Sequence, residues 1–272
     1  RSVIKAMRRL LIRFKGTVDL KKPKSKLYVM EGLFRIEKKS ITKVLVREIA
    51  VGPKLSTIAP NTRICVTNTP LCPTASFLLC NVAGVRDGVS ILDPFAGSCS
   101  ILIAAAMIAS KVTTVGIEIA GDCLVDRSAI MRDFGVRKLP VPRALLEGDC
   151  TDPDVRMLAR NALSPDKTKP FDLIITDPPY GTRESVKNTE STPTEDLVLS
   201  IVHDREAGTP LLKVGGKLVL FVPVRHAEGE TIEQCLPKKE LLDRAGLSLE
   251  QLREQRINSK FDRWLVSYRC IA

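Results

Sequence analysis

The stretch that most constrains the fold of this chain runs from Phe171 to Gly181 and reads F-D-L-I-I-T-D-P-P-Y-G. The apolar run Leu173–Ile175 predicts a buried strand, because it is too short for a helix. The segment Asp177–Tyr180 follows, and its two prolines remove two backbone donors and fix φ, so the turn is stiff and cannot continue a sheet ladder. It presents a carboxylate, a carbonyl oxygen and an aromatic ring at the carboxyl end of a strand, where open α/β sheets bind ligands.

Strands and helices alternate on both sides of this stretch, which predicts an α/β fold with a largely parallel sheet. Apolar and β-branched runs predict further strands over 89–92, 113–117, 144–146 and 217–222. Helical patterns cover 69–83, 101–109, 122–134 and 237–247, and another helix begins over 197–202. Residues 255–269 predict two strands with a turn near Asn258, a pair that suits the antiparallel edge of a mixed sheet.

The basic charge of the chain is concentrated in its first quarter. Residues 1–63 hold 17 Lys and Arg against 4 Asp and Glu, whereas the remainder holds 25 against 27. This segment predicts a helix over 3–14 and short strands over 17–20, 26–30 and 41–51. A basic segment beside a nearly neutral domain favours a polyanion as partner, with a solvated lysine-rich face as the alternative.

Several classes of protein are disfavoured by what the sequence lacks. No apolar run of about 18 residues predicts a membrane span, and the first residues carry no signal-peptide pattern. The eight cysteines form no C-x-x-C pair, which disfavours a zinc site in this chain, and their scatter suggests a reducing, cytoplasmic location. A G-x-G-x-x-G fingerprint, a P-loop and a G-x-S-x-G elbow are also missing.

Acidic residues follow four of the predicted strands. Asp93 opens the turn D-P-F-A-G-S-C-S before a predicted helix, an arrangement in which backbone N–H groups face a ligand. Glu118 comes about 20 residues later, where a carboxylate can accept hydrogen bonds from ribose hydroxyls. Asp149 and Asp177 follow the next two strands. Four acids along one sheet edge, with a glycine turn at the first, predict a nucleoside-binding pocket.

These motifs resemble S-adenosylmethionine-dependent amino-methyltransferases, in which a D-P-P-Y turn follows a buried strand. The longer run D-P-P-Y-G-T-R-E-S is similar to one branch, the THUMP-containing tRNA guanosine-10 N2-methyltransferases. Asn68–Asn81 and Asn258–Tyr268 resemble the cofactor helix and final hairpin of that branch, and Phe14–Pro23 resembles the end of a THUMP domain. The resemblance implies a Rossmann-like methyltransferase fold with a mostly parallel seven-stranded sheet and an antiparallel edge strand.

The resemblance also implies how the chain is divided and what it binds. Residues 1–51 correspond to the C-terminal part of a THUMP-like RNA-binding domain, 52–63 to a linker and 64–272 to the methyltransferase domain. The implied cofactor is S-adenosyl-L-methionine, with no resident metal. The implied partners are tRNA and, as in eukaryotic members, a small zinc-binding activator subunit, with no membrane.

Carried over to the matching positions, the resemblance implies a role for each motif residue. The carboxylate of Asp177 and the carbonyl of Pro178 accept from the guanine N2 amine, and Tyr180 stacks on the flipped base. Glu118 holds the ribose hydroxyls and Asp149 accepts from the adenine amino group. Further cofactor contacts fall on Thr69, Pro70, Asp93, Pro94, Ala96, Gly97, Ser98, Ile119 and Cys150. Further substrate contacts fall on Pro179, Gly181 and Arg183.

The chemistry of an exocyclic amine explains why two acceptors are needed. Its lone pair is delocalised into the ring, so the nitrogen is a weak nucleophile. Two acceptors that grip its hydrogens favour a pyramidal nitrogen and stabilise the positive charge as the methyl group transfers. A base inside a helix must be flipped out to reach them, and an aromatic platform offsets the lost stacking.

The sequence departs from the family pattern at Cys99, where a second glycine is common. A Cβ at this position crowds the backbone where it approaches the cofactor. Two alternatives stay open beside the RNA guanine-N2 methyltransferase. One is a DNA amino-methyltransferase that acts on adenine N6 or cytosine N4, and the other is a catalytically weak RNA-binding module with the same fold.

Overall fold

The computed structural model describes residues 27–36, 40–47, 58–66, 70–119, 126–164, 169–180 and 192–272. The chain divides into two compact units, residues 1–53 and 54–272. The helix predicted over 3–14 and the strand predicted over 17–20 lie outside the described residues.

The described part of the smaller unit is an antiparallel hairpin. Strand β1 (Leu27–Ile36) pairs with β2 (Ser40–Arg47), with Leu27 opposite Arg47 and Ile36 opposite Ser40. Strands are predicted over 26–30 and 41–51, so β1 continues beyond its predicted end. The register shifts between Glu31 and Arg35, which marks an irregularity of the β-bulge kind.

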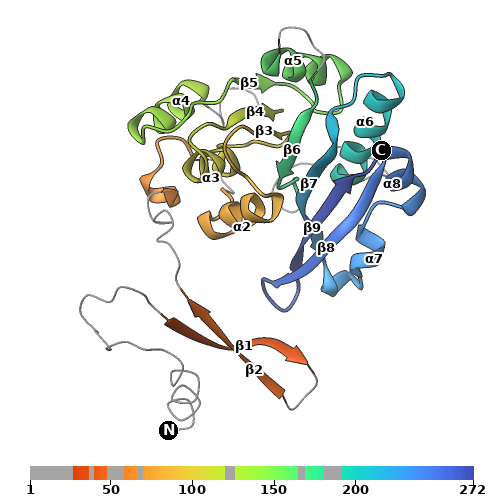
Figure 1. Cartoon of the computed structure of the whole chain (residues 1–272). Coiled ribbons are helices and arrows are strands. Elements are labelled where there is room, and N and C mark those ends of the chain that lie inside the picture. Colours follow the sequence, from red (N-terminus) through yellow and green to blue (C-terminus); the bar gives the residue numbers. More distant parts are fainter. Residues whose placement is uncertain are drawn as a thin grey trace. The chain divides into compact units, whose positions relative to one another are not determined.

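The larger unit is built on a seven-stranded sheet with the order β5-β4-β3-β6-β7-β9-β8 (Figure 1). The first five strands pair in parallel; they are β5 (Ala144–Glu147), β4 (Thr113–Glu118), β3 (Ser90–Asp93), β6 (Phe171–Thr176) and β7 (Leu212–Val224). Strand β9 (Asp262–Cys270) runs antiparallel to β7 and to the edge strand β8 (Leu247–Arg256). The predicted mostly parallel sheet with antiparallel pairing at its edge is confirmed.

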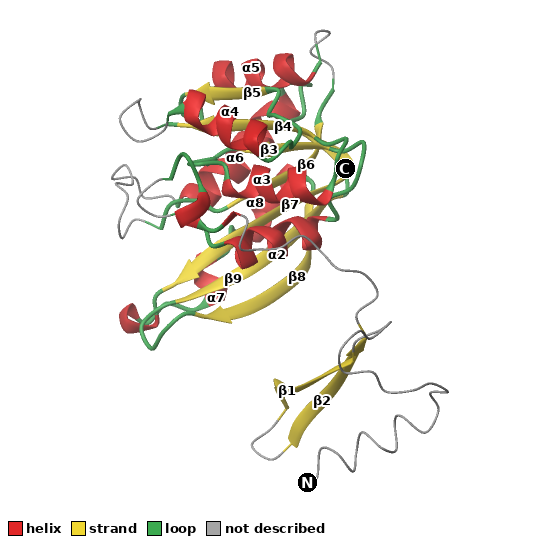
Figure 2. Ribbon diagram, turned by 90° about the vertical axis from the view of Figure 1, so that its left-hand side faces the viewer, coloured by secondary structure: helices red, strands yellow, loops and turns green. Residues whose placement is uncertain are grey.

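Helices cover both faces of this sheet (Figure 2). One face packs against α2 (Pro73–Ala83), α3 (Ser100–Ile108) and α4 (Arg127–Val136). The other packs against α5 (Pro153–Leu163), α6 (Pro193–Glu206), α7 (Ile232–Cys235) and α8 (Lys239–Ala245). Successive strand residues alternate between the two apolar clusters, as Ile91 and Leu92 do on β3, which gives the three layers of an α/β domain. Among the described helices, none is long and apolar enough to cross a membrane.

The structure corrects three details of the sequence prediction. Helices α5 and α7 were not predicted, although α5 carries a start signal: Asp152 caps it by accepting from the N–H of Asp154 at 2.8 Å, and Pro153 takes its first position. Strand β7 begins at Leu212, because Gly215 (φ +81°) and its neighbour lie inside the strand, at a point where its register with β6 shifts, rather than in a turn before it. Helix α8 is shorter than predicted, because β8 already begins at Leu247.

Candidate active site

The sheet order brings the four predicted acids to one edge in a row. Asp93 and Glu118 end β3 and β4, Asp177 directly follows β6, and Asp149 lies just beyond β5. Because β5, β4, β3 and β6 are parallel neighbours, the acids stand in the order Asp149, Glu118, Asp93, Asp177. Three acids therefore lie around the glycine turn, and the fourth lies on the side of β7.

Asp93 is a buried carboxyl group at the centre of this row, with 1% of its surface exposed. The Thr176 hydroxyl donates to its Oδ1 at 2.7 Å, and the Phe95 N–H donates to the same oxygen at 3.2 Å. Burial raises the pKa of Asp93 to about 7; the two hydrogen bonds oppose that shift, and the charges of Glu118 and Asp177 add to it. Asp93 therefore exchanges a proton near neutral pH.

The turn after β3 is fixed by contacts to the neighbouring strand β4. The Ala96 N–H donates to the Ile117 carbonyl at 2.9 Å, and the Gly97 N–H donates to a Glu118 carboxylate oxygen at 2.7 Å. Cys99, the residue before α3, has a left-handed backbone with φ +62° and a buried side chain. That conformation is uncommon for residues with a Cβ, so this position suits glycine better than cysteine.

A buried ion pair holds the same turn from the segment that precedes α2. Arg63 Nε lies 2.5 Å from Asp133 Oδ2 on α4, and the two side chains are 2% and 0% exposed. The Arg63 guanidinium also donates to the Ser98 carbonyl and lies 3.5 Å from the Ser100 hydroxyl. Burial by itself raises the pKa of Asp133, but hydrogen bonds from Arg63 and the Ile64 N–H, together with the charges of Arg63 and Arg137, outweigh it and hold that pKa below its ordinary value. Arg63 thus ties the turn to α4.

Asp149 and Cys150 lie just beyond β5, and their side chains have different surroundings. One oxygen of Asp149 accepts from the Thr151 N–H at 2.9 Å and from the Thr151 hydroxyl at 2.7 Å. The Cys150 side chain is buried in the core under α5 and α6, where burial raises the pKa of the thiol to about 12. Its carbonyl accepts from Arg156 at 3.0 Å, and Arg156 is itself buried against Asp204. Cys150 therefore contributes packing and a positioned backbone rather than a thiol on the surface.

The Asp177–Tyr180 turn is held by side-chain contacts. The Tyr180 hydroxyl donates to Asp177 Oδ1, and the Tyr180 carbonyl accepts from the Arg225 guanidinium. The Tyr180 ring lies 5.6 Å from the Phe261 ring, centroid to centroid, at an interplanar angle of 43°. Burial, followed by the Asp177 charge, raises the pKa of Tyr180 above its ordinary value, so its hydroxyl stays a donor.

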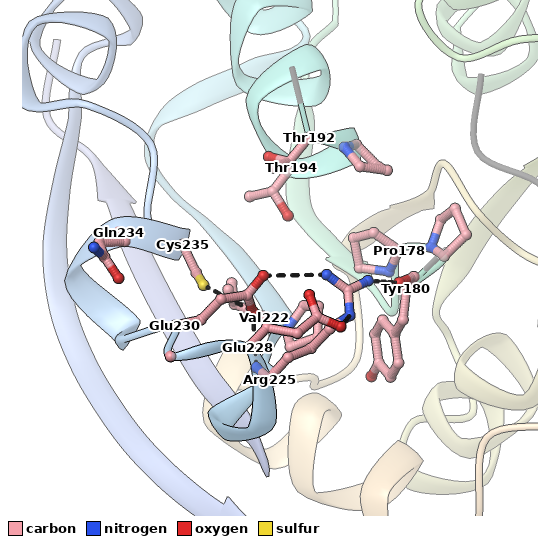
Figure 3. A pocket seen from close by; sticks show the side chains of 14 residues that line it. Pro178, Tyr180, Thr192, Thr194, Val222, Arg225, Glu228, Glu230, Gln234 and Cys235 are labelled. Atoms are coloured by element: carbon pink, nitrogen blue, oxygen red, sulfur yellow. Dashed lines mark hydrogen bonds and ion pairs between the residues drawn. The ribbon is translucent and has the colours of Figure 1, made fainter. Parts of the chain in front are cut away.

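A pocket of about 540 Å³ opens beside this turn (Figure 3). The turn supplies Pro178, Pro179 and Tyr180, and another side is formed by Thr192, which caps α6, and the first residues of that helix. The remaining wall comes from the end of β7 and the segment up to α7, including Arg225, Glu228, Glu230 and Cys235. This volume is in the range of small-ligand sites, so a nucleobase fits it.

The remaining predicted residues fall into two groups. Pro94, Ala96 and Ser98 are buried in or beside the glycine turn, Pro70 is half-buried before α2, and Ile119 is 59% exposed after β4. Thr69, Gly181 and Arg183 lie outside the described residues.

Among the site residues that were not assigned a role from the sequence are Arg63, Arg225 and Phe261. Phe261 falls in the predicted final hairpin, which offered a signal for it. Arg63 contacts residues 35 and 70 positions away, and Arg225 reaches back 45 positions to Tyr180. No local pattern indicates contacts of that range.

The fold and the row of acids resemble those of Rossmann-like methyltransferases, a class that uses S-adenosyl-L-methionine. Residues 60–136 match the family model described as "RMKL-like, methyltransferase domain". The chain is 27% identical to tRNA (guanine(10)-N(2))-methyltransferase TRMT11 of Mus musculus, over 79% of this chain and 53% of that protein. With the Homo sapiens protein of the same name it shares 26% identity, over 93% of this chain and 60% of that protein.

The fold is also found among solved structures. TrmN from Thermus thermophilus superimposes with a TM-score of 0.50 at 19% sequence identity, over 98% of this chain and 66% of that chain. The comparisons confirm the resemblance to the tRNA guanosine-10 N2-methyltransferase family. The chain spans a little over half the length of the curated relatives it matches.

Proposed function

We propose that this chain is the catalytic part of an enzyme that methylates the exocyclic N2 amine of a guanosine in tRNA, at position 10. The names of the relatives support the substrate. The single observation that carries the proposal is the placement of Asp177 and Pro178 at the end of the acid row, between the glycine turn and a pocket of nucleobase size.

The acid row fits the polar groups of S-adenosyl-L-methionine. Glu118 accepts from the ribose hydroxyls, Asp149 from the adenine amino group, and Asp93 faces the methionine end. The backbone of Ala96–Ser98 lies against the cofactor, as its anchoring to β4 allows. When bound there, the cofactor supplies a methyl group on a positively charged sulfur.

The acceptor side holds the amine in a reactive geometry. The Asp177 carboxylate and the Pro178 carbonyl accept the two N–H bonds of the guanine N2 amine and favour a pyramidal nitrogen. On accepting the methyl group, the amine nitrogen would become positive and would then lose one proton to water. Asp177 stabilises that charge and need not take the proton first. Because Tyr180 donates to Asp177 Oδ1, the arriving amine replaces this contact while the ring stacks on the flipped base.

Further substrate and partner contacts belong to the same proposal. Pro179, Gly181 and Arg183 contact the substrate next to the flipped base. Residues 1–51 act as the C-terminal part of a THUMP-like RNA-binding domain, and their basic charge suits tRNA phosphates. A small zinc-binding activator subunit assists in the cytoplasm, and co-purification with the full-length protein tests that part.

One experiment tests the proposed reaction. The full-length protein is incubated with tritiated S-adenosylmethionine and with either tRNA transcripts or duplex DNA, and the product nucleosides are identified. We expect label only in N2-methylguanosine from tRNA. Label only in DNA would support the DNA amino-methyltransferase instead. A lack of cofactor binding in calorimetry, with and without a partner subunit, would support the non-catalytic module.

A further inference from the structure

The acceptor pocket carries charged groups that the proposed transfer does not use. Arg225 directly follows β7, Glu228 belongs to the short helix η3 (His226–Glu228), and Glu230 lies two residues further on. All three line the pocket together with Pro178 and Tyr180 (Figure 3). Charged side chains beside the two predicted amine acceptors are suited to reading the rest of the base edge.

Arg225 connects the turn to both glutamates. Its guanidinium donates to the Tyr180 carbonyl and lies 3.2 Å from Glu230 Oε1. Its Nε lies 4.0 Å from Glu228 Oε1. Arg225 therefore contacts the turn and also holds the Glu228 carboxylate on the side of the turn that faces the pocket.

The carboxylates of the two glutamates differ in how many contacts they already make within the protein. Glu230 accepts from the Arg225 backbone N–H at 2.8 Å and from its side chain at 3.2 Å, and the Cys235 thiol lies 3.7 Å from it. The Glu228 side chain is 63% exposed, and its one ionic contact within the described residues is the 4.0 Å approach of Arg225. Glu230 therefore anchors Arg225, whereas Glu228 has oxygens that can accept from a ligand.

The backbone that carries Glu228 is fixed. Its N–H donates to the Arg225 carbonyl at 3.0 Å, and Gly229 closes η3 with a left-handed φ of +76°. The ring of His226 lies 2.7 Å from the buried Asp262 carboxylate on β9. Glu228 is thus a flexible side chain on a rigid base, which suits a group that closes on a ligand.

The bases that carry an exocyclic amine differ at the ring atom beside that amine. In guanine, N1–H is a donor next to the N2 amine. In adenine and cytosine, the ring nitrogen next to the amine is an acceptor. A carboxylate beside the amine acceptors therefore attracts guanine and repels the lone pair of the other two. Sites that hydrogen-bond a substrate N–H discriminate strongly against analogues that lack it.

We propose that Glu228 accepts the N1–H of the target guanine and is the residue that selects guanine at this site. The inference rests on the proposed function. Glu230 has the separate role of a positioning residue, because it holds Arg225 against the Tyr180 carbonyl.

The test uses an analogue that keeps the N2 amine and changes only the adjacent groups. Full-length protein is given tRNA with either guanosine or 2-aminopurine ribonucleoside at the target position, and kcat/KM is measured for both. 2-Aminopurine has an acceptor at N1 and no oxygen at C6. We expect the wild type to prefer guanosine by at least about 100-fold. Glu228→Gln, whose amide can donate to N1, narrows this preference at least about tenfold.

Two control variants separate base reading from support of the pocket. Glu230→Gln should lower kcat/KM for both substrates by the same factor, because it loosens Arg225. Glu233→Gln removes the same charge from an exposed position outside this pocket and should change neither value. Equal use of both substrates by the wild type, or an unchanged preference in Glu228→Gln, overturns the role of Glu228. A wild type that methylates neither tRNA overturns the proposed function, and the inference with it.

Discussion

The two ends of the acid row are held in different ways. At the cofactor end, the glycine turn is fixed by its own backbone and by buried charges: Glu118 accepts from Gly97, and Arg63 joins Ser98 to Asp133. At the acceptor end, the Asp177–Tyr180 turn is held by side chains that border an open pocket. The cofactor end is therefore formed before a ligand arrives, whereas the acceptor end has contacts that a base can replace.

This difference matches the demands of the two ligands. A cofactor bound in the same way in every cycle benefits from a site whose donors are already oriented. A flipped base must enter past Tyr180 and take over a hydrogen bond on Asp177, so contacts there must exchange. Substitutions at the acceptor end should change transfer more than binding of the cofactor, and substitutions at the cofactor end should do the reverse.

The largest effect is expected from Asp177→Ala at the acceptor end. Loss of one of the two amine acceptors should lower kcat by about 10³-fold, while the Kd for the cofactor changes by no more than about threefold. Single-turnover methyl transfer and calorimetry measure the two quantities. Asp243→Ala, at an exposed position on α8, serves as a matched control that should change neither. An Asp177→Ala variant that still transfers methyl groups at the normal rate would refute the role of Asp177.

Arg63→Ala should have the next largest effect, at the cofactor end. It leaves the buried Asp133 with Arg137 as its remaining ionic partner among the described residues, so we expect a loss of about 1–3 kcal/mol in the free energy of unfolding. It also releases the Ser98 carbonyl, so the cofactor Kd should rise at least about tenfold. Chemical denaturation and calorimetry measure these changes.

The double variant Arg63→Met with Asp133→Leu separates the two consequences. It removes both of these charges and should regain part of the stability, since apolar pairs often replace buried ion pairs without loss, while Arg137 keeps its contact to the Thr62 carbonyl. The Ser98 carbonyl remains without Arg63, so the affinity for the cofactor should stay low. Recovery of affinity together with stability would mean that Arg63 supports the fold alone.

Asp93, at the cofactor end, should make the stability of the protein depend on pH. Its pKa is about 7 in the folded protein against an ordinary value of 3.8, so between these pH values the folded chain binds more protons than the unfolded chain. Stability therefore falls as pH rises through this window, and Asp93→Asn, which cannot ionise, should escape that fall. Relative to the variant, the wild type should lose on the order of a few kcal/mol between pH 4 and pH 8. Chemical denaturation at a series of pH values measures this difference. If the free energies of unfolding of the wild type and of Asp93→Asn change in parallel between pH 4 and pH 8, the raised pKa is contradicted.

The sequence predicted those parts of the site that depend on local pattern. Each acid of the row follows a strand that periodicity reveals, and the parallel order then places the acids side by side. The contacts that fix the two turns depend on tertiary packing: Arg63 reaches Ser98 and Asp133, and Arg225 reaches Tyr180, across long stretches of chain. The register shift at Gly215 was mistaken for a turn, because a glycine pair is typical of both a turn and a strand irregularity.

The smallest expected effect concerns Cys99, where the rigid turn carries strain. A left-handed backbone costs a residue with a Cβ about 1 kcal/mol, whereas glycine adopts it freely. Cys99→Ala and Cys99→Gly both remove the buried sulfur, but only glycine relieves the backbone, so Cys99→Gly should be the more stable of the two by about 1 kcal/mol. The same two substitutions at Cys80, which is equally buried but lies within α2, serve as the matched control. There the alanine variant should be more stable than the glycine variant by about 1 kcal/mol. Chemical denaturation of the four variants measures both differences. If alanine is favoured at both positions, the turn at Cys99 is not strained, and its rigidity comes from Arg63 and Glu118 alone.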